Sequence, residues 1–71
     1  METNERKIKL GAKIRMLREK QGLSQRKFAL MVDTNQTHLW QIETGRTNIG
    51  FDLLCRIADG LGVQVRDLIE F

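Results

Sequence analysis

Five side chains in the middle of the chain have the types and spacing of a surface that could read DNA bases. A helical step of about 100° per residue places them on one face of segment 36–44: Gln36, Thr37, Trp40, Gln41 and Thr44. Leu39 and Ile42 fall on the opposite face, and none of the five carries an acidic group. Glutamine can form two hydrogen bonds to adenine, and the threonine methyl group can contact the thymine methyl group. The pattern therefore predicts that this segment lies in the major groove of double-stranded DNA.

The polar face forms the second half of a helix–turn–helix pattern over residues 24–46. Ser24 and Asn35 are predicted to cap the two helices, because such side chains accept hydrogen bonds from the free N–H groups of a first helical turn. Asp33 lies in the turn between them, where a residue with positive φ is often needed and Asp tolerates it better than most. Gly45 is predicted to end the second helix.

Three further helices are predicted around this pattern. They span three segments: from Thr3 or Asn4, either of which could cap the helix, to a stop at Gly22; from Phe51 to Gly60; and from Val65 to Ile69. Spacings of three and four residues predict the buried side chains: Leu10, Ile14, Leu17, Phe28, Ala29, Val32, Phe51, Leu54, Cys55, Ala58, Leu61 and Leu68. Gly11, inside the first helix, costs about 0.5–1 kcal/mol relative to Ala, which a closely packed neighbouring helix would explain. The predicted fold is all-α, a compact five-helix bundle.

Positive charge gathers in the first two thirds of the chain. Residues 1–46 hold ten Lys or Arg against five Asp or Glu, whereas residues 47–71 hold two against four. This asymmetry fits a face for a polyanion, but it also fits helices whose charges are simply solvated. Arg26 and Lys27 begin a helix whose dipole disfavours cations there, a conflict that a bound phosphate would relieve. The predicted contacts to the DNA backbone are Arg15, Gln25, Arg26, Lys27, Trp40, Thr44, Arg46, Thr47 and Asn48.

The rest of the composition excludes several classes of protein. With 71 residues the chain forms one domain, 1–71. Cys55 is the only Cys and His38 the only His, so neither a disulfide framework nor a metal cluster can form. No glycine-rich phosphate loop or nucleophile–His arrangement is present, so we expect no enzyme, no cofactor and no small-molecule ligand. No apolar run approaches the ~20 residues of a membrane span and no secretory signal is visible, which predicts a cytoplasmic protein.

Residues from nearly the whole chain form one ordered pattern. It consists of Leu10-Gly11, Ile14-Arg15, Leu17-Arg18, Gly22-Leu23-Ser24-Gln25, Phe28-Ala29, Leu39, Ile42-Glu43, Gly45-Arg46, Ile57-Ala58, Leu61-Gly62-Val63 and Leu68. In this order and spacing, over residues 8–70, the pattern resembles the Cro-like, phage-repressor helix-turn-helix family, often called XRE. The resemblance implies a lambda-repressor-like five-helix fold, with the third helix in the major groove, in a transcriptional regulator of a bacterium or phage.

The resemblance also implies roles for particular residues. It implies three base contacts, from Gln36, Thr37 and Gln41. It implies that Gln25 contacts the DNA backbone and also touches the first residue of the recognition helix. It implies a structural salt bridge between Arg18 and Glu43, which would join the first and third helices.

The chain departs from the family pattern at two places. Asp33 and Thr34 occupy a turn where the family usually has Gly and then an aliphatic residue, so the geometry of the turn is less defined. Trp40 replaces a small or polar residue. Its indole either lies along the DNA backbone or folds back onto the loop 44–50. Large aromatic side chains usually bury themselves, which favours the second arrangement.

Four apolar residues in the C-terminal part predict a symmetric dimer that binds a palindromic operator: Ile49, Leu53, Val65 and Phe71. Leu53 lies off the predicted inward stripe of its helix, and the first three match or lie near family positions at the dimer axis. A two-fold contact requires like patches on two copies of the chain. Alternatively, these residues complete the core of a single chain.

The predicted function is sequence-specific binding of double-stranded DNA by a small transcriptional regulator. The rival from another class is a helical protein-interaction module that does not bind DNA, because the same helices can serve either role. The face of helix 36–44 carries no acid and is flanked by Arg and Lys, which favours DNA.

Overall fold

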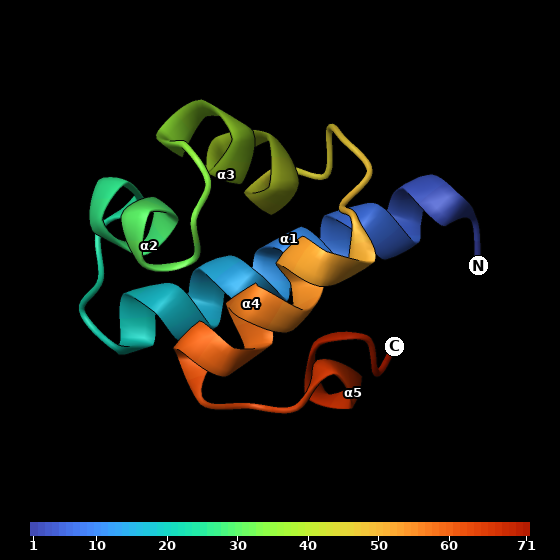
Figure 1. Cartoon of the computed structure of the whole chain (residues 1–71). Helices are drawn as coiled ribbons and strands as arrows, with labels where there is room; N and C mark the ends of the chain where they lie inside the picture. Colours follow the sequence, from blue (N-terminus) through green and yellow to red (C-terminus); the bar gives the residue numbers. More distant parts are fainter.

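The structure, a computed structural model that describes residues 1–71, consists of five α-helices without strands (Figure 1). The helices are α1 (Thr3–Lys20), α2 (Gln25–Met31), α3 (Gln36–Glu43), α4 (Phe51–Leu61) and α5 (Val65–Leu68). The predicted all-α fold is confirmed, and each predicted helix is present at its expected place in the chain.

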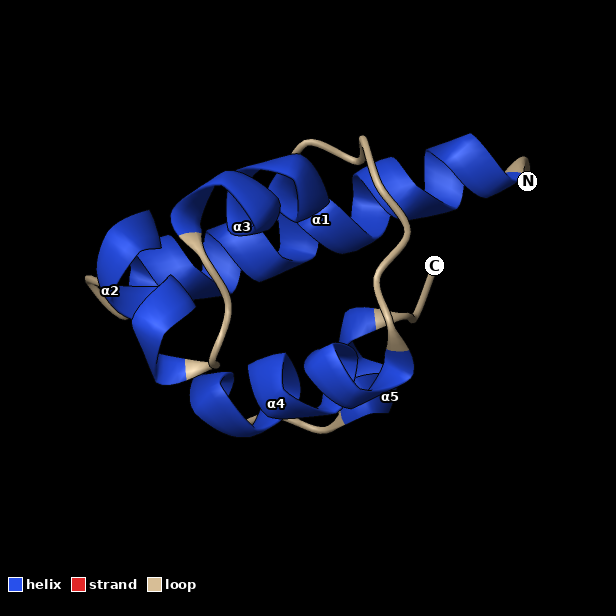
Figure 2. Cartoon of the chain, turned by 45° about the horizontal axis from the view of Figure 1, so that its top comes forward, coloured by secondary structure: helices blue, strands red, loops and turns tan.

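The longest helix, α1, lies at the centre of the arrangement. It contacts α3, α4 and α5, and α2 packs against α3. Figure 2 shows α3 in front of α1 in the upper part of the view, with α2 at the left and α4 and α5 together below them. The helix that carries the predicted base contacts is thus held by two neighbours and keeps one side exposed. None of the five helices is both long enough and apolar enough to cross a bilayer.

One hydrophobic core joins the five helices. Its twelve buried side chains are Ile14, Phe28, Ala29, Val32, Leu39, Ile42, Leu53, Leu54, Ile57, Ala58, Leu61 and Leu68. Leu10 and Leu17 are half-buried and pack against this core. The predicted inward faces of α2, α3 and α5 are therefore confirmed, and in α1 the predicted stripe is centred on Ile14.

The two caps of the helix–turn–helix are present as predicted. Ser24 Oγ accepts a hydrogen bond from the backbone N–H of Lys27 at 3.0 Å, and Asn35 Oδ1 accepts one from that of His38 at 2.8 Å. Asp33, in the turn between the helices, has a φ of 60°. These caps and this turn fix where α3 begins and how it departs from α2.

α1 begins at Thr3, as predicted, but the predicted side-chain cap of this helix is wrong. Thr3 and Asn4 both lie inside the helix, and the extended residue before it is Glu2, with φ −70° and ψ 154°. A capping side chain must belong to that extended residue, so a hydroxyl at Thr3 comes one position too late. Glu2 itself forms no side-chain cap.

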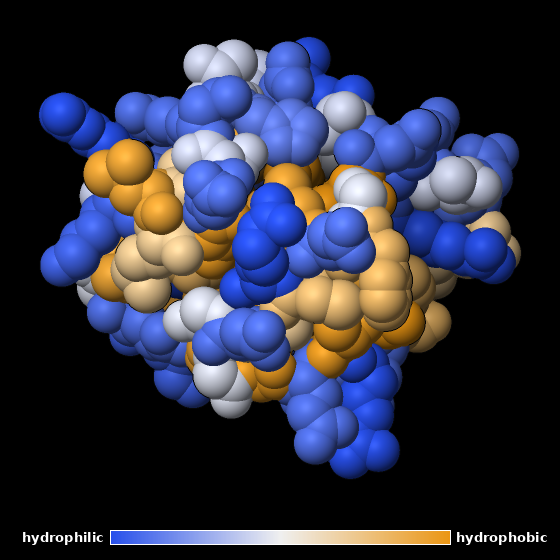
Figure 3. All heavy atoms as spheres, viewed as in Figure 1, coloured by the Kyte–Doolittle hydropathy of each residue, from blue (hydrophilic) through white to orange (hydrophobic).

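The predicted inward face of α4 is confirmed for Leu54, Ala58 and Leu61, which are buried, and is wrong for its other two residues. Phe51 is 70% exposed and Cys55 is only half-buried, whereas Leu53 and Ile57 are buried. The apolar residues of α4 form one broad arc opposite Asp52, Arg56 and Asp59, and its contacts with α1 and α5 bury the part of that arc that includes Leu53. The prediction that Leu53 lies off the inward face is therefore wrong. Apolar side chains over the start of α4 face solvent instead (Figure 3).

Gly11 lies where α1 passes directly over the backbone of α3. A Cβ atom added to Gly11 would lie 2.6 Å from the carbonyl oxygen of Glu43 and closer still to that of Ile42. Backbone atoms on both sides of the contact cannot move independently of their helices, so no side chain fits there. The expectation that a closely packed helix explains this glycine is confirmed.

Candidate nucleic-acid interface

The exposed side of α3 carries the side chains predicted to contact bases. Gln36 and Thr37 are exposed and Gln41 is half-buried, while Leu39 and Ile42 lie in the core. The division of α3 into a polar outer face and an apolar inner face is therefore as predicted from its helical period.

Gln36 and Thr37 also border a shallow hollow between α2 and α3. Its other walls are Gln25, at the start of α2, and Trp40, one turn further along α3. Amide and hydroxyl groups can both donate and accept hydrogen bonds. The hollow thus presents groups that suit base edges and backbone oxygens without imposing a charge.

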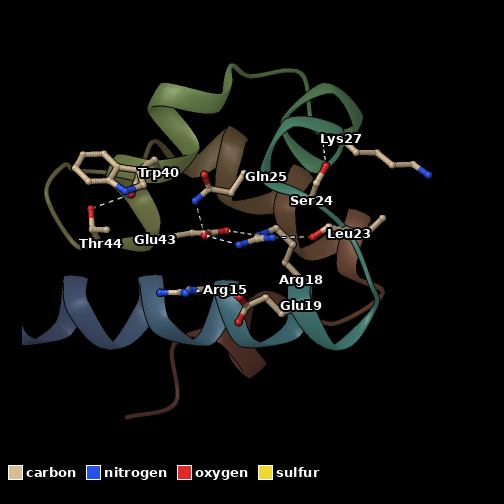
Figure 4. Close-up of polar contacts among 10 residues, drawn as sticks. All are labelled: Arg15, Arg18, Glu19, Leu23, Ser24, Gln25, Lys27, Trp40, Glu43 and Thr44. Atoms are coloured by element: carbon tan, nitrogen blue, oxygen red, sulfur yellow. Dashed lines mark hydrogen bonds and ion pairs between the residues drawn. The ribbon is translucent and has the colours of Figure 1, made fainter.

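Glu43, the one acidic residue of α3, is taken out of the exposed face by Arg18 of α1. Arg18 Nε donates to Glu43 Oε2 at 2.7 Å, and Arg18 Nη2 donates to Glu43 Oε1 at 3.0 Å (Figure 4). Both residues are 6% exposed. The predicted salt bridge is present, and the outer face of α3 is left without a carboxylate.

The same ion pair holds the start of α2. Gln25 Nε2 donates to Glu43 Oε1 at 3.0 Å, and Arg18 Nη1 donates to the carbonyl oxygen of Leu23 at 2.7 Å. The hydrogen bond to Glu43 raises the pKa of Arg18 above its ordinary value, although burial acts in the opposite direction. The family resemblance implies that Gln25 touches Gln36. The hydrogen bond that Gln25 forms goes to Glu43, since a carboxylate is the stronger acceptor.

Basic side chains lie on the two helices next to α3. Arg26 and Lys27 are exposed in the first turn of α2, which contains no acidic residue. Arg15 of α1 is exposed and borders a hollow that Trp40 also lines. Its only ion pair is a 3.4 Å contact with Glu19, in which both side chains are more than half exposed. Such exposed pairs contribute little, so Arg15 is available to an anion.

Trp40 is 44% exposed, and Arg46 from the following loop folds over its ring, with the guanidinium carbon 5.0 Å from the ring centroid. Of the two arrangements considered for the indole, contact with the loop is therefore present. Thr44 donates its hydroxyl proton to the carbonyl oxygen of Trp40 at 2.8 Å, so this proton is used inside α3. Thr47 is half-buried and Asn48 is exposed in the same loop.

Lys7 was not among the residues predicted to contact the DNA backbone, although it lies beside two that were. Its side chain is half-buried and lines a hollow together with Thr47 and Asn48 beside α3. Lys7 comes one helical turn before Gly11, which marks the side of α1 that packs on α3. Because residues four apart share a helix face, the spacing from Gly11 could have identified it.

The residues predicted at a dimer interface differ in exposure. Leu53 is buried, whereas three keep exposed surface: Ile49, Val65 and Phe71. Phe51 and Ile69, which were not predicted, are 70% and 45% exposed. Figures 1 and 2 both place the start of α4 near the C-terminal end of the chain, so these apolar residues belong to one end of the molecule.

Comparison of the sequence with known proteins gives matches over nearly its full length. Residues 14–68 match the model of a helix-turn-helix family. The chain is 37% identical over 70 residues to the control protein C.BamHI of Bacillus amyloliquefaciens, covering 97% of this chain and 86% of that protein. It is 39% identical over 68 residues to the control protein C.MunI of a Mycoplasma species, and this match covers 94% of this chain and 92% of that protein.

Solved structures share the fold. The restriction-modification controller protein C.AhdI from Aeromonas hydrophila superposes with a TM-score of 0.83 at 28% identity, covering 86% of this chain and 92% of that one. The DNA-binding domain of BldD superposes with a TM-score of 0.84 at 28% identity, covering 97% of this chain and 100% of that one.

Proposed function

The chain belongs to the helix-turn-helix family of DNA-binding transcription regulators, and we propose that it reads specific double-stranded DNA sequences with α3 in the major groove. The observation that carries this proposal is the outer face of α3. Its exposed groups are amides, a hydroxyl and an indole, and the only carboxylate of the helix is bound inside by Arg18. A face without negative charge can approach the bases, where Gln36, Thr37 and Gln41 would contact their edges.

Phosphate contacts are proposed for the basic and polar side chains around this face. The candidates are Lys7, Arg15, Gln25, Arg26, Lys27, Arg46, Thr47 and Asn48. Such contacts orient a protein on the duplex without reading its sequence. Thr44 is not included, because its hydroxyl proton is already donated to the backbone of α3.

The relatives support a more specific role. Two of them are control proteins, and C.AhdI is a restriction-modification controller. We propose that this chain likewise controls transcription of restriction–modification genes, and that it acts in the cytoplasm of a bacterium, where those genes lie. The rival, a protein-interaction module, remains an outcome of the test that follows.

Replacing single residues of the outer face is expected to relax base preference without unfolding the protein. A binding site is first selected from random duplexes with the unmodified chain, and each base pair of that site is then varied. Gln36→Ala, Thr37→Ala or Gln41→Ala should lose about 1–3 kcal/mol at one base pair and discriminate less there. The side chains face outward, so the melting temperature should stay unchanged.

Thr3→Ala is the matched control, because Thr3 is exposed at the far end of α1. Its base preference should equal that of the unmodified chain. If all three α3 variants also keep that preference, α3 is not the reader. If the unmodified chain selects no duplex, the protein-interaction module becomes the better proposal.

We propose in addition that two chains bind a palindromic operator as a symmetric dimer. The contact surface would be the apolar end formed by Phe51, Ile69 and Phe71, bordered by Ile49 and Val65. Figure 3 shows apolar side chains gathered over the start of α4. Leu53 is not part of this surface because it is buried in the core of each chain. Half-sites would be spaced about 10–10.5 base pairs apart.

Phe51→Glu combined with Phe71→Glu is expected to change the complex with a palindromic duplex from two chains to one, because charges on both sides of a two-fold axis repel each other. Analytical ultracentrifugation gives the stoichiometry. Met16→Glu, on a similarly exposed apolar residue of α1, should leave two chains on the duplex. If two chains of the double variant still bind one duplex, the dimer interface lies elsewhere on the molecule.

A further inference from the structure

The end of α3 brings Arg46 back over Trp40. Gly45 has a φ of 72°. The N–H of Gly45 donates to the carbonyl oxygen of Ile42 at 3.1 Å, and the N–H of Arg46 donates to the carbonyl oxygen of Gln41 at 2.9 Å. These two hydrogen bonds form a Schellman motif, in which the residue after the glycine often makes an apolar contact with the last turns of the helix. In this chain the contact is between a guanidinium and an indole, 5.0 Å from carbon to ring centroid.

Arg46 is held by the ring but has no acceptor for its N–H groups. The ion pairs of the chain are those of Arg15 and Arg18, and no side-chain hydrogen bond involves Arg46. A cation above an aromatic face uses the face of the guanidinium and leaves its five in-plane donors free. Arg46 is exposed, so these donors point to solvent or to a ligand.

A second arginine lies close to the indole. Arg15 of α1 borders the hollow that Trp40 and Thr44 also line. Two arginines therefore lie near Trp40 at the edge of the outer face of α3, one from α1 and one from the loop after α3. Planar donors on guanidinium groups match the oxygens of a phosphate.

We propose that Trp40 is a positioning residue that holds Arg46 in place to bind a phosphate of the DNA backbone beside the bases read by α3. The inference rests on the proposed function, because the phosphate belongs to the DNA that α3 contacts. An arginine already ordered on a ring loses less conformational freedom on binding than one in solvent. The alternative is that the contact only closes the end of α3, as the apolar contact of any Schellman motif does.

Three variants separate these roles: Trp40→Leu, Arg46→Leu and the two together. Leucine keeps an apolar contact at the end of the helix but removes the aromatic face or the charge. Arg66→Leu is the control, since Arg66 is an exposed arginine on α5. Binding to the selected duplex and to an unrelated duplex is measured by fluorescence anisotropy of labelled DNA over a range of salt concentrations, and the melting temperature of each variant is recorded.

Arg46→Leu should weaken binding to both duplexes and make the log–log salt slope shallower by about 0.9 for each bound chain, because each chain loses one phosphate contact. Trp40→Leu should weaken binding about two- to fivefold and leave the slope unchanged, because the charge is still present. The double variant should bind no more weakly than Arg46→Leu, since Trp40 acts through Arg46. Arg66→Leu should leave the affinity and the slope unchanged.

Several outcomes would overturn the inference. If Trp40→Leu binds as the unmodified chain does, the ring does not position Arg46. If the effects of the two substitutions add in the double variant, Trp40 acts independently, through a contact of its own or through the stability of α3. If the unmodified chain binds neither duplex, the proposed function fails together with this inference, an outcome distinct from additive effects in a chain that binds.

Discussion

Gly11→Ala is expected to destabilise the protein strongly, although Ala favours a helix more than Gly does. On propensity alone the change would stabilise α1 by about 0.5–1 kcal/mol. The new methyl group, however, would meet the backbone carbonyls of Ile42 and Glu43, the latter at 2.6 Å. Overpacking costs typically about 1–3 kcal/mol and occasionally more, and here only a displacement of α1 from α3 relieves it. The free energy of unfolding should therefore fall by about 2 kcal/mol or more.

The measurement is thermal unfolding followed by circular dichroism. A loss of 1 kcal/mol lowers the melting temperature of a domain this small by about 4–8 °C. Ala12→Gly is the matched control, because Ala12 is the exposed neighbour in the same helix and its replacement reports propensity alone. It should cost only about 0.5–1 kcal/mol. A higher melting temperature for Gly11→Ala would mean that α1 and α3 do not pack through their backbones.

Local signals were enough to predict the helix–turn–helix. Ser24 and Asn35 cap α2 and α3 as expected, because capping depends on a side chain and the turn that follows it. The orientation of α4 could not be predicted in the same way. From Phe51 to Leu61 the apolar residues form one arc that is wider than the buried face, so their period does not define which edge of that arc is buried. Packing against α1 and α5 determines the orientation of α4, and Phe51 remains exposed to solvent.

In the candidate site, too, local features could be predicted from the sequence and contacts between distant residues could not. The outer position of Gln36 and Thr37 follows from the helical period of α3. The partner of Gln25 does not, since the oxygen of Glu43 that it binds comes from eighteen residues further along the chain. The contact of Arg46 with Trp40 is local, and it agrees with one of the two arrangements predicted for the indole, against the loop 44–50. The contact of Gln25 with Glu43 is set by tertiary geometry, which neither composition nor spacing records.

Glu43→Ala is expected to cause the largest loss of stability among the polar substitutions. Arg18 would stay buried with its charge, since a guanidinium remains protonated in a folded protein even without an acidic partner. Removing one partner of a buried pair costs about 3–5 kcal/mol. Gln25 would also lose the acceptor of its amide at the start of α2. Glu19→Ala is the control, because the pair of Glu19 with Arg15 is exposed and is worth about 0–1 kcal/mol.

A double variant, Arg18→Met with Glu43→Leu, tests whether the loss comes from the stranded charge. Replacing both members of a buried pair by apolar groups of similar size is often neutral or stabilising, so the double variant should recover most of the melting temperature that Glu43→Ala loses. Neither side chain reaches the outer face of α3, so its base preference should match that of the unmodified chain. Recovered stability with an altered preference would assign the pair a part in reading DNA, because a purely structural pair affects α3 only through its stability.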